Sequence, residues 1–240
     1  MTTVFPKNVH LISTSRFINK GAGKACTFVN GYADFNLATH VGDDLSSVEL
    51  NRKRLIQHYN LPSVPKYLEQ THSDICLDVS SAECLGDAVV TSDKNTICCV
   101  MTADCLPIFA SNSNGTQVGV AHAGWQGIVN GVIESFVARF NQQELIVHFG
   151  PAISQNNFEV GQDVYDQFIA KEDSLAQAFI PFNNKYKLNI YQAARIILNK
   201  LGVENISGGD QCTFMQADEY FSYRRDGLKS GRMAHLIWMK

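Results

Sequence analysis

The stretch from Met101 to Gly127, MTADCLPIFASNSNGTQVGVAHAGWQG, contains two apolar runs joined by a polar turn. LPIFAS and TQVGVAHA indicate strands, and the NSNG between them indicates a hairpin, since Asn-Gly suits a type I′ turn. The second run leads through AGWQG into helical spacing that begins at Ile128. This order predicts a sheet covered by helices, in a domain of α/β or α+β class.

Apolar side chains at helical spacing extend this pattern along the chain. Helices are predicted over 43–61, with Ser46 or Ser47 as N-cap, over 127–140 as a single helix, and over 189–203, with Asn189 as cap and Gly202 as stop. Further strands are predicted in KYLEQ, DICLDV, DAVVTS, TICCVMT, ELIVHFG and HLIWM. Strands occur both next to each other and beside helices, so mixed sheets are expected rather than a simple doubly wound sheet.

Composition and charge narrow the class of protein. Apolar residues make up 45% of the 240 residues, enough for a sizeable core, and the formal net charge of −3 argues against a nucleic-acid partner. No apolar run approaches the roughly 18 residues of a membrane helix. The N-terminus lacks the layout of a secretory signal, and the seven cysteines, Cys26 among them, are an odd number. We therefore expect reduced thiols, no membrane partner and a cytoplasmic location.

One thiol and two imidazoles are candidates for chemistry. Cys105 and His122 lie at the ends of neighbouring predicted strands, and His72 lies in the polar stretch LEQTHSD. Such a His2Cys set is compatible with tetrahedral zinc that keeps one position open. Taken singly, each residue also has an ordinary reading, as a buried thiol or as part of a plain turn. Asp104, beside Cys105, could orient a donor or accept a proton.

Two further segments could bind an anion. Gly124 and Gly127 lie where a strand leads into a helix, and a helix N-terminus attracts phosphate. Basic side chains cluster in YFSYRRDGLKSGRM, namely Arg224, Arg225, Lys229 and Arg232. They form either a solvated surface loop or a site for phosphate or carboxylate, which the planar guanidinium fork suits.

Motifs along nearly the whole chain resemble those of the cytosolic laccase-domain family, also called multicopper polyphenol oxidase-like. They occur in the family's order: STSRFINKGAG, FNLATHVGDDLSSVELNR, EQTHSD, VMTADCLPI, AHAGWQGIVNGVIE, HFGPAIS, NFEVG and CTFMQADEYFSYRRDGLKSGRM. Two positions depart from its pattern. Gln126 replaces the arginine of HAGWRG, and Asn157 stands where many members carry cysteine.

The resemblance implies a fold and a metal. The fold would be one layered α/β/β/α domain over residues 1–240, with mixed sheets, similar to the catalytic domain of cytotoxic necrotizing factor toxins. The family's zinc ligands fall on His72, Cys105 and His122. Members are described as purine nucleoside phosphorylases. The implied activities are phosphorolysis of adenosine, inosine, guanosine and S-methyl-5′-thioadenosine, and deamination of adenosine. Some bacterial members are linked instead to peptidoglycan editing.

Several functions therefore stay open. The first is a zinc-dependent purine nucleoside enzyme, with nucleosides and phosphate as ligands. Its catalytic residues would be His72, Asp104, Cys105 and His122, and its phosphate ligands Gly124, Gly127, Arg224 and Arg225. The second is a hydrolase or amidase with Cys105 as nucleophile and His122 as base.

The two remaining readings are weaker. A copper oxidase ranks low, because seven histidines are too few for a four-copper laccase, although copper could occupy the His2Cys set. A small-molecule-binding subunit without activity is the plainest alternative. In an enzyme, Asp104, His148 and Glu159 are the candidates for general acid–base catalysis.

Overall fold

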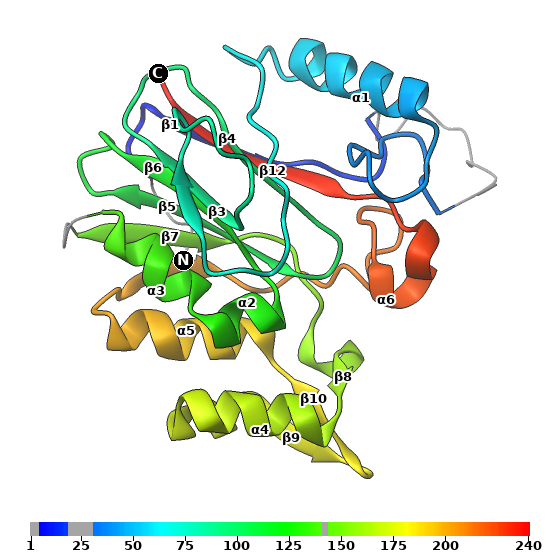
Figure 1. The fold of residues 1–240 in the computed structure, drawn as a ribbon, viewed down its shortest axis with the longest axis vertical. Coiled ribbons are helices and arrows are strands. Elements are labelled where there is room, and N and C mark those ends of the chain that lie inside the picture. Colours follow the sequence, from blue (N-terminus) through cyan, green and yellow to red (C-terminus); the bar gives the residue numbers. More distant parts are fainter. Residues whose placement is uncertain (1–4, 19–30, 141–143) are drawn as a thin grey trace.

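Two β-sheets pack face to face between helices in the computed structural model, which describes residues 5–18, 31–140 and 144–240 (Figure 1). Cys26 and residues 19–23 of the predicted N-terminal motif lie outside these described residues. Among the residues that the structure describes, every helix is too short or too polar to span a lipid bilayer.

The larger sheet has six strands, in the order β11-β7-β5-β6-β3-β2. Its strands are β2 (Cys76–Asp78), β3 (Ala88–Thr91), β5 (Leu106–Asn112), β6 (Val118–Ala123), β7 (Leu145–Phe149) and β11 (Asn205–Gly208). The two outermost pairs are parallel and the inner ones antiparallel, as expected for a mixed sheet. The predicted hairpin joins β5 to β6. Within its NSNG turn only Gly115 has a positive φ, so the turn is not of type I′.

The smaller sheet has the order β1-β12-β4, with β12 (Met233–Met239) antiparallel to both β1 (Val9–Ser13) and β4 (Cys98–Thr102). Both β4 and β12 are buried along their whole length. Their side chains alternate between the two faces: Cys98 packs against the larger sheet, whereas Cys99 packs on the opposite side. The hydrophobic layer between the sheets therefore comes from alternate residues of β3, β4, β5, β6 and β12.

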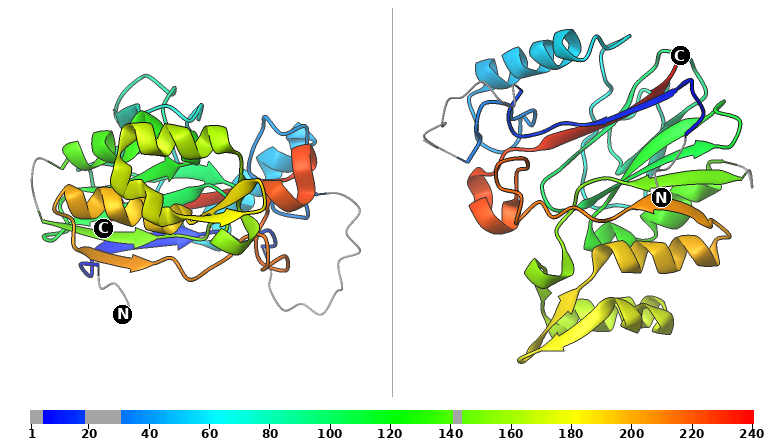
Figure 2. Two further views of the ribbon diagram at one scale, coloured as in Figure 1. Left: turned by 90° about the horizontal axis from the view of Figure 1, so that it is seen from below. Right: turned by 180° about the vertical axis from the view of Figure 1, so that it is seen from behind.

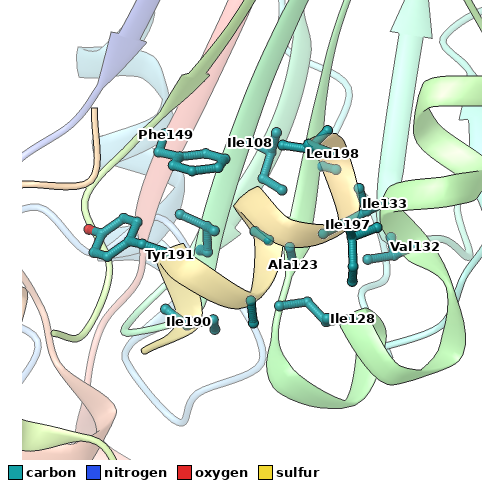
Figure 3. Close-up of a cluster of buried hydrophobic side chains, with 14 of the residues drawn as sticks. Ile108, Ala123, Ile128, Val132, Ile133, Phe149, Ile190, Tyr191, Ile197 and Leu198 are labelled. Atoms are coloured by element: carbon teal, nitrogen blue, oxygen red, sulfur yellow. The ribbon is translucent and has the colours of Figure 1, made fainter. Parts of the chain in front are cut away.

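Helices cover the two outer faces. Leu55 and Ile56 of α1 (Leu45–His58) pack on the smaller sheet. The larger sheet is covered by α2 (Trp125–Asn130), α3 (Val132–Ala138) and α5 (Ile190–Lys200). Figure 3 shows α5 contributing Ile197 and Leu198 to this core, beside Val132 of α3. The layer order is α/β/β/α, which confirms the predicted fold class.

Besides the turn type, three local predictions were wrong. The apolar spacing over 127–140 continues through Gly131, but this glycine has φ 108° and divides the segment into α2 and α3. The N-cap of α1 is Asp44, whose side chain accepts from the Ser47 N–H, and not Ser46 or Ser47. KYLEQ forms only isolated bridges, at Lys66 and Glu69. At the 189–203 helix, by contrast, Asn189 caps α5 as predicted and Gly202 follows its end with φ 80°.

A small unit that was not predicted projects beyond α5 (Figures 1 and 2). It consists of α4 (Gln162–Lys171) and a sheet of order β8-β10-β9, with strands β8 (Glu159–Val160), β9 (Phe179–Phe182) and β10 (Lys185–Leu188). The short helix α6 (Tyr223–Asp226) was also not predicted. Short 3-10 helices are η1 (Gln155–Asn157), η2 (Asp173–Ala178) and η3 (Gly227–Lys229).

Candidate metal centre

The structure brings His72, Cys105 and His122 together at one end of the larger sheet. One ligand atom from each of the three residues lies within 4.8 Å of the others, and Cys105 Sγ is 3.6 Å from His72 Nε2. Cys105 ends the turn between β4 and β5, and His122 pairs with Pro107 across β5 and β6. The hairpin thus brings the thiol next to the imidazole, and the loop before β2 adds His72.

Asp87 connects the two histidines and was missed in the sequence. Its fully buried carboxylate accepts from His122 Nδ1 at 2.8 Å and from the His72 backbone N–H at 3.0 Å. It also accepts from the N–H and the hydroxyl of Ser73, each at 2.7 Å. Burial would raise the pKa of Asp87, but the hydrogen bonds from His122 and Ser73 lower it to about 2. The available signal was an acidic residue directly before the apolar run AVV.

The hydrogen bond to Asp87 fixes the orientation of the His122 ring. Because an ionised carboxylate only accepts, Nδ1 of His122 keeps its proton, and Nε2 on the other side of the ring is the atom that can bind a metal once it has lost its own proton. Many metal-binding histidines are held by a carboxylate in this way. One buried carboxylate therefore sets the tautomer of one ligand and the backbone position of another.

Cys105 and His122 form a charged pair. Burial would raise the pKa of the Cys105 thiol, but the charge and hydrogen bond of His122, together with His72, lower it to about 6. Burial would lower the pKa of His122, whereas the Cys105 sulfur and Asp87 raise it. Cys105 is thus a thiolate near neutral pH, which is the form that binds metals and attacks as a nucleophile.

Gly124 is required for the close approach of these groups, whereas Gly127 is not. A Cβ atom at Gly124 would lie 2.8 Å from His72 Nε2 and 3.0 Å from Cys105 Sγ. At Gly127 the nearest atom, in Val132, would be 3.4 Å away, an ordinary contact. Neither glycine lines the cavity described below, so their predicted role in holding phosphate gains no support from their position.

Asp104 links the Cys105 turn to the C-terminal segment. Its backbone has φ 89°, and its carboxylate accepts from Thr213 Oγ1 at 2.6 Å, Ser222 Oγ at 3.0 Å and the Arg224 N–H at 2.6 Å. Because its oxygens are held by three donors, this geometry favours a positioning role over the predicted transfer of protons.

The two neighbouring arginines have different surroundings. Arg224 lines the cavity, where it donates to the Glu159 carbonyl at 2.9 Å. The Arg225 guanidinium instead pairs with Asp226 at 2.8 Å and donates to the carbonyls of Thr213, Phe214 and Tyr220. Arg225 is therefore a structural link, and its position does not support the predicted contact with phosphate.

The other acid–base candidates lie away from the metal-ligand group. His148 hydrogen-bonds Ser207 Oγ at 2.8 Å, and the Glu159 carboxylate pairs with Lys185 at 2.7 Å. Neither residue lines the cavity. Gln126, at the position where the family carries arginine, is exposed in the first turn of α2 and also lies outside the lining.

A cavity of about 450 Å³ opens next to His72, Cys105 and His122. Its size falls in the range of small-molecule sites. Besides the three possible ligands, aromatic and cationic side chains line it, among them Trp125, Phe158, Tyr223, Arg224 and Arg232. Gln70, in the predicted EQTHSD motif, also lines it and is held by hydrogen bonds to the backbone N–H and carbonyl of Met101 at 2.7 and 2.8 Å.

This arrangement defines a protein with a cavity of small-molecule size beside a potential metal-ligand group. The chain belongs to the multi-copper polyphenol oxidoreductase laccase family, whose model matches residues 22–240. The resemblance seen in the motifs is thereby confirmed.

Individual relatives agree with this assignment. The chain is 42% identical to a purine nucleoside phosphorylase of Haemophilus influenzae, over 98% of this chain and 96% of the relative. It is 45% identical to the purine nucleoside phosphorylase YfiH of Escherichia coli, over 87% of each chain. A crystal structure of a Neisseria meningitidis protein matches with a TM-score of 0.88 and 39% identity, over 98% of this chain and 96% of the other.

The donor set fits a metal ion. One thiolate and two imidazoles are the donors that zinc takes in sites with an open position, and copper accepts the same atoms. The hydrogen bond from His122 to Asp87 matches the outer support that metal-binding histidines receive. His72, Cys105 and His122 could therefore hold one ion.

Proposed function

We propose that the protein is a zinc-dependent purine nucleoside enzyme. It cleaves adenosine, inosine and guanosine with phosphate, giving the free base and ribose 1-phosphate. It cleaves S-methyl-5′-thioadenosine in the same way, giving adenine and methylthioribose 1-phosphate, and it deaminates adenosine to inosine. The observation that carries the proposal is the opening of the His72–Cys105–His122 group onto a cavity with aromatic and cationic walls. The purine nucleoside phosphorylase names of relatives at 42% and 45% identity support the substrate class.

The residues of this chain have distinct tasks in that reaction. A zinc ion bound to the three ligands would supply a Lewis acid and a water of lowered pKa. Asp87 keeps the proton of His122 on Nδ1, and Gly124 leaves space for the ligands. Trp125, Phe158 and Tyr223 offer ring faces on which a purine can stack. In phosphorolysis, a phosphate oxygen forms the new bond to C1′ as the bond from C1′ to the base breaks.

Zinc is proposed over copper because of the number of sites. Among the described residues, His72, Cys105 and His122 form the one group of His, Cys, Asp or Glu suited to an ion. A multicopper oxidase needs further copper sites for its electron transfers. All cysteines in the described ranges are unpaired, which agrees with the reducing conditions of the cytoplasm, where we place the reaction.

The test is a product assay with zinc-loaded protein. Wild type is incubated with adenosine or inosine, with and without phosphate, and hypoxanthine, inosine and ribose 1-phosphate are measured. Cys105→Ala should retain less than about a hundredth of the rate, since it loses the thiolate ligand. Absence of products from zinc-replete wild type would refute the proposal.

A cysteine hydrolase remains a second candidate, because the Cys105 sulfur lies within 4.8 Å of a ring nitrogen of His122, and His122 is bound in turn by Asp87. The pKa of His122 is raised and that of Cys105 is lowered, as in an ion pair of nucleophile and base. Such a pair would suit an amidase that acts on peptidoglycan precursors. Metal-free protein incubated with precursor peptides should then carry an acyl adduct on Cys105, detectable by mass spectrometry. Activity that requires zinc excludes this reading.

A further inference from the structure

Arg232 lines the same cavity as the three possible metal ligands. It lies between η3 and β12, and its backbone N–H donates to Asn36 Oδ1 at 3.0 Å. Asn36 is 1% exposed and donates to the Ala38 carbonyl and to Asp43. Segments from both ends of the chain thus fix the position of this arginine.

Among the described residues, the protein hydrogen-bonds only one nitrogen of the Arg232 guanidinium, whose Cζ lies over the Tyr223 ring at 5.8 Å from the ring centre. Nη1 donates to the Ser230 and Gly231 carbonyls at 2.7 and 3.1 Å. Within the described ranges no acidic side chain forms an ion pair with Arg232, and no acceptor is bound by its Nε or Nη2. These two atoms form one edge of the guanidinium, which can donate hydrogen bonds to two oxygens of one anion.

The surroundings of Arg232 make an unpaired charge costly. Burial lowers the pKa of the guanidinium, while Cys105 and Asp104 lie near enough for their charges to act against this effect. A partly buried cation is stabilised when an anion completes its hydrogen bonds. Asp104 is already held by three donors, so its carboxylate does not supply that anion.

A second guanidinium lines the same cavity. Arg224 is exposed, lies over the Phe158 ring at 5.4 Å, and forms no ion pair among the described residues. Phosphate and other tetrahedral oxyanions are commonly bound between two such groups.

We propose that Arg232, together with Arg224, forms an oxyanion subsite that holds inorganic phosphate beside the His72–Cys105–His122 group. This inference rests on the proposed phosphorolysis and names the residues that bind its second substrate. It replaces Arg225, Gly124 and Gly127 in that role. The competing explanation is that Arg232 serves only to stabilise the Cys105 thiolate.

The experiment compares three variants of the full chain loaded with zinc. Arg232→Met removes the charge together with the Nε and Nη2 donors. Arg232→Lys keeps the charge but lacks the planar guanidinium that can donate to two oxygens at once. Lys229→Met is the matched control, because it removes one positive charge from an exposed residue three positions away that does not line the cavity. Binding of inorganic phosphate is measured by titration calorimetry, and the KM values for phosphate and inosine are measured in the product assay.

We expect Arg232→Met to raise the Kd and the KM for phosphate by at least about tenfold, as loss of a charged hydrogen-bond pair does. Arg232→Lys should recover part of the loss, and Lys229→Met should stay within about twofold of wild type. The KM for inosine should change little in all three.

Several results would overturn the subsite. One is wild-type protein that binds no phosphate. Another is an Arg232→Met protein that binds phosphate as tightly as wild type does. If that protein has lost zinc but not phosphate binding, Arg232 serves only to stabilise the Cys105 thiolate. If Arg232→Met fails to fold, an unchanged Kd in both Arg232→Lys and Arg224→Met has the same meaning. Phosphate binding that depends on Arg232 without formation of ribose 1-phosphate would refute the phosphorolysis and retain the subsite. Phosphorolysis that is unaffected by Arg232→Met would refute the subsite and retain the proposed phosphorolysis.

Discussion

At the scale of single residues, the carboxylate of Asp87 links the two histidines of the candidate metal centre. It binds the ring of His122 and the backbone N–H of His72, which lie 50 positions apart in the sequence, from within a fully buried setting. A buried carboxylate with donors on both oxygens is stable only while those donors stay in place. The arrangement of the ligands and the charge of Asp87 therefore depend on each other.

Asp87→Asn should weaken metal binding. The amide cannot accept from His122 as a carboxylate does, so the ring loses both its orientation and its electrostatic support, with an expected loss of about 10- to 100-fold in zinc affinity. Competition with a chelator of known affinity measures the change. Asp74→Asn, on an exposed residue two positions after His72, is the control and should bind zinc as wild type does. Equal affinities in the two variants would show that Asp87 has no such role.

At the scale of elements, the junction between β6 and α2 determines how closely the ligands approach. Gly124 lies directly after the strand that carries His122, with its Cα facing His72 and Cys105. Any side chain there would displace one of them.

We expect Gly124→Ala to abolish or greatly weaken zinc binding while the protein still folds. Its Cβ would come within 3.0 Å of the Cys105 sulfur and closer still to His72. Gly127→Ala is the matched control, since its Cβ would meet only ordinary contacts and alanine favours a helix over glycine by about 1 kcal/mol. Zinc content after dialysis measures metal binding, and circular dichroism shows whether the variant folds. Normal zinc content in Gly124→Ala would contradict the predicted steric conflict.

The turn between β4 and β5 is tied to the segment around α6 by Asp104. If this carboxylate positions the segment and does not transfer protons, Asp104→Asn should lower the free energy of unfolding by about 1–3 kcal/mol. The shape of the pH–rate profile should remain that of wild type. Urea unfolding and the profile are measured in parallel with Asp93→Asn, a change at an exposed site. Disappearance of one limb of the profile would instead assign a proton-transfer role to Asp104.

At the scale of the whole molecule, His235 joins all strands of the smaller sheet. It lies on β12 and hydrogen-bonds Ser13 of β1 at 2.9 Å and Thr102 of β4 at 2.8 Å. Full burial, with a smaller contribution from the His122 charge, lowers the pKa of His235 from 6.5 to about 3. The folded protein thus keeps this ring neutral where the unfolded chain takes up a proton.

This difference predicts loss of stability in acid. Between about pH 6.5 and pH 3 the unfolded chain binds one more proton than the folded one at His235, so the free energy of unfolding falls as pH falls. The contribution approaches about 1.4 kcal/mol per pH unit. His235→Gln should be less stable than wild type at pH 7.5. The difference between the two free energies of unfolding should be smaller by about 2 kcal/mol at pH 5. Urea unfolding at both pH values measures this difference. A difference that is the same at both pH values would contradict the lowered pKa of His235.

The sequence predicted the parts of this structure that depend on local pattern. Apolar, β-rich runs identified β3, β5, β6 and β12, and the motifs identified His72, Cys105 and His122, which the fold brings together. The break at Gly131 was missed because the apolar spacing continues on both sides of it. The role of Asp87 could not be seen, since its partner His122 lies 35 positions away. The choice between Arg225 and Arg232 likewise depends on which carbonyls the folded loop presents to each.

The position of β12 between β1 and β4 has a consequence for biosynthesis. A ribosome makes the thiol and both imidazoles of the metal-ligand group more than a hundred residues before it reaches this strand. The nascent polypeptide thus holds all three possible metal ligands while the strand that closes the smaller sheet, and Arg232 just before it, have yet to be translated. Metal capture can precede completion of the fold, and an ion acquired early would then act as a template on which the last segment docks.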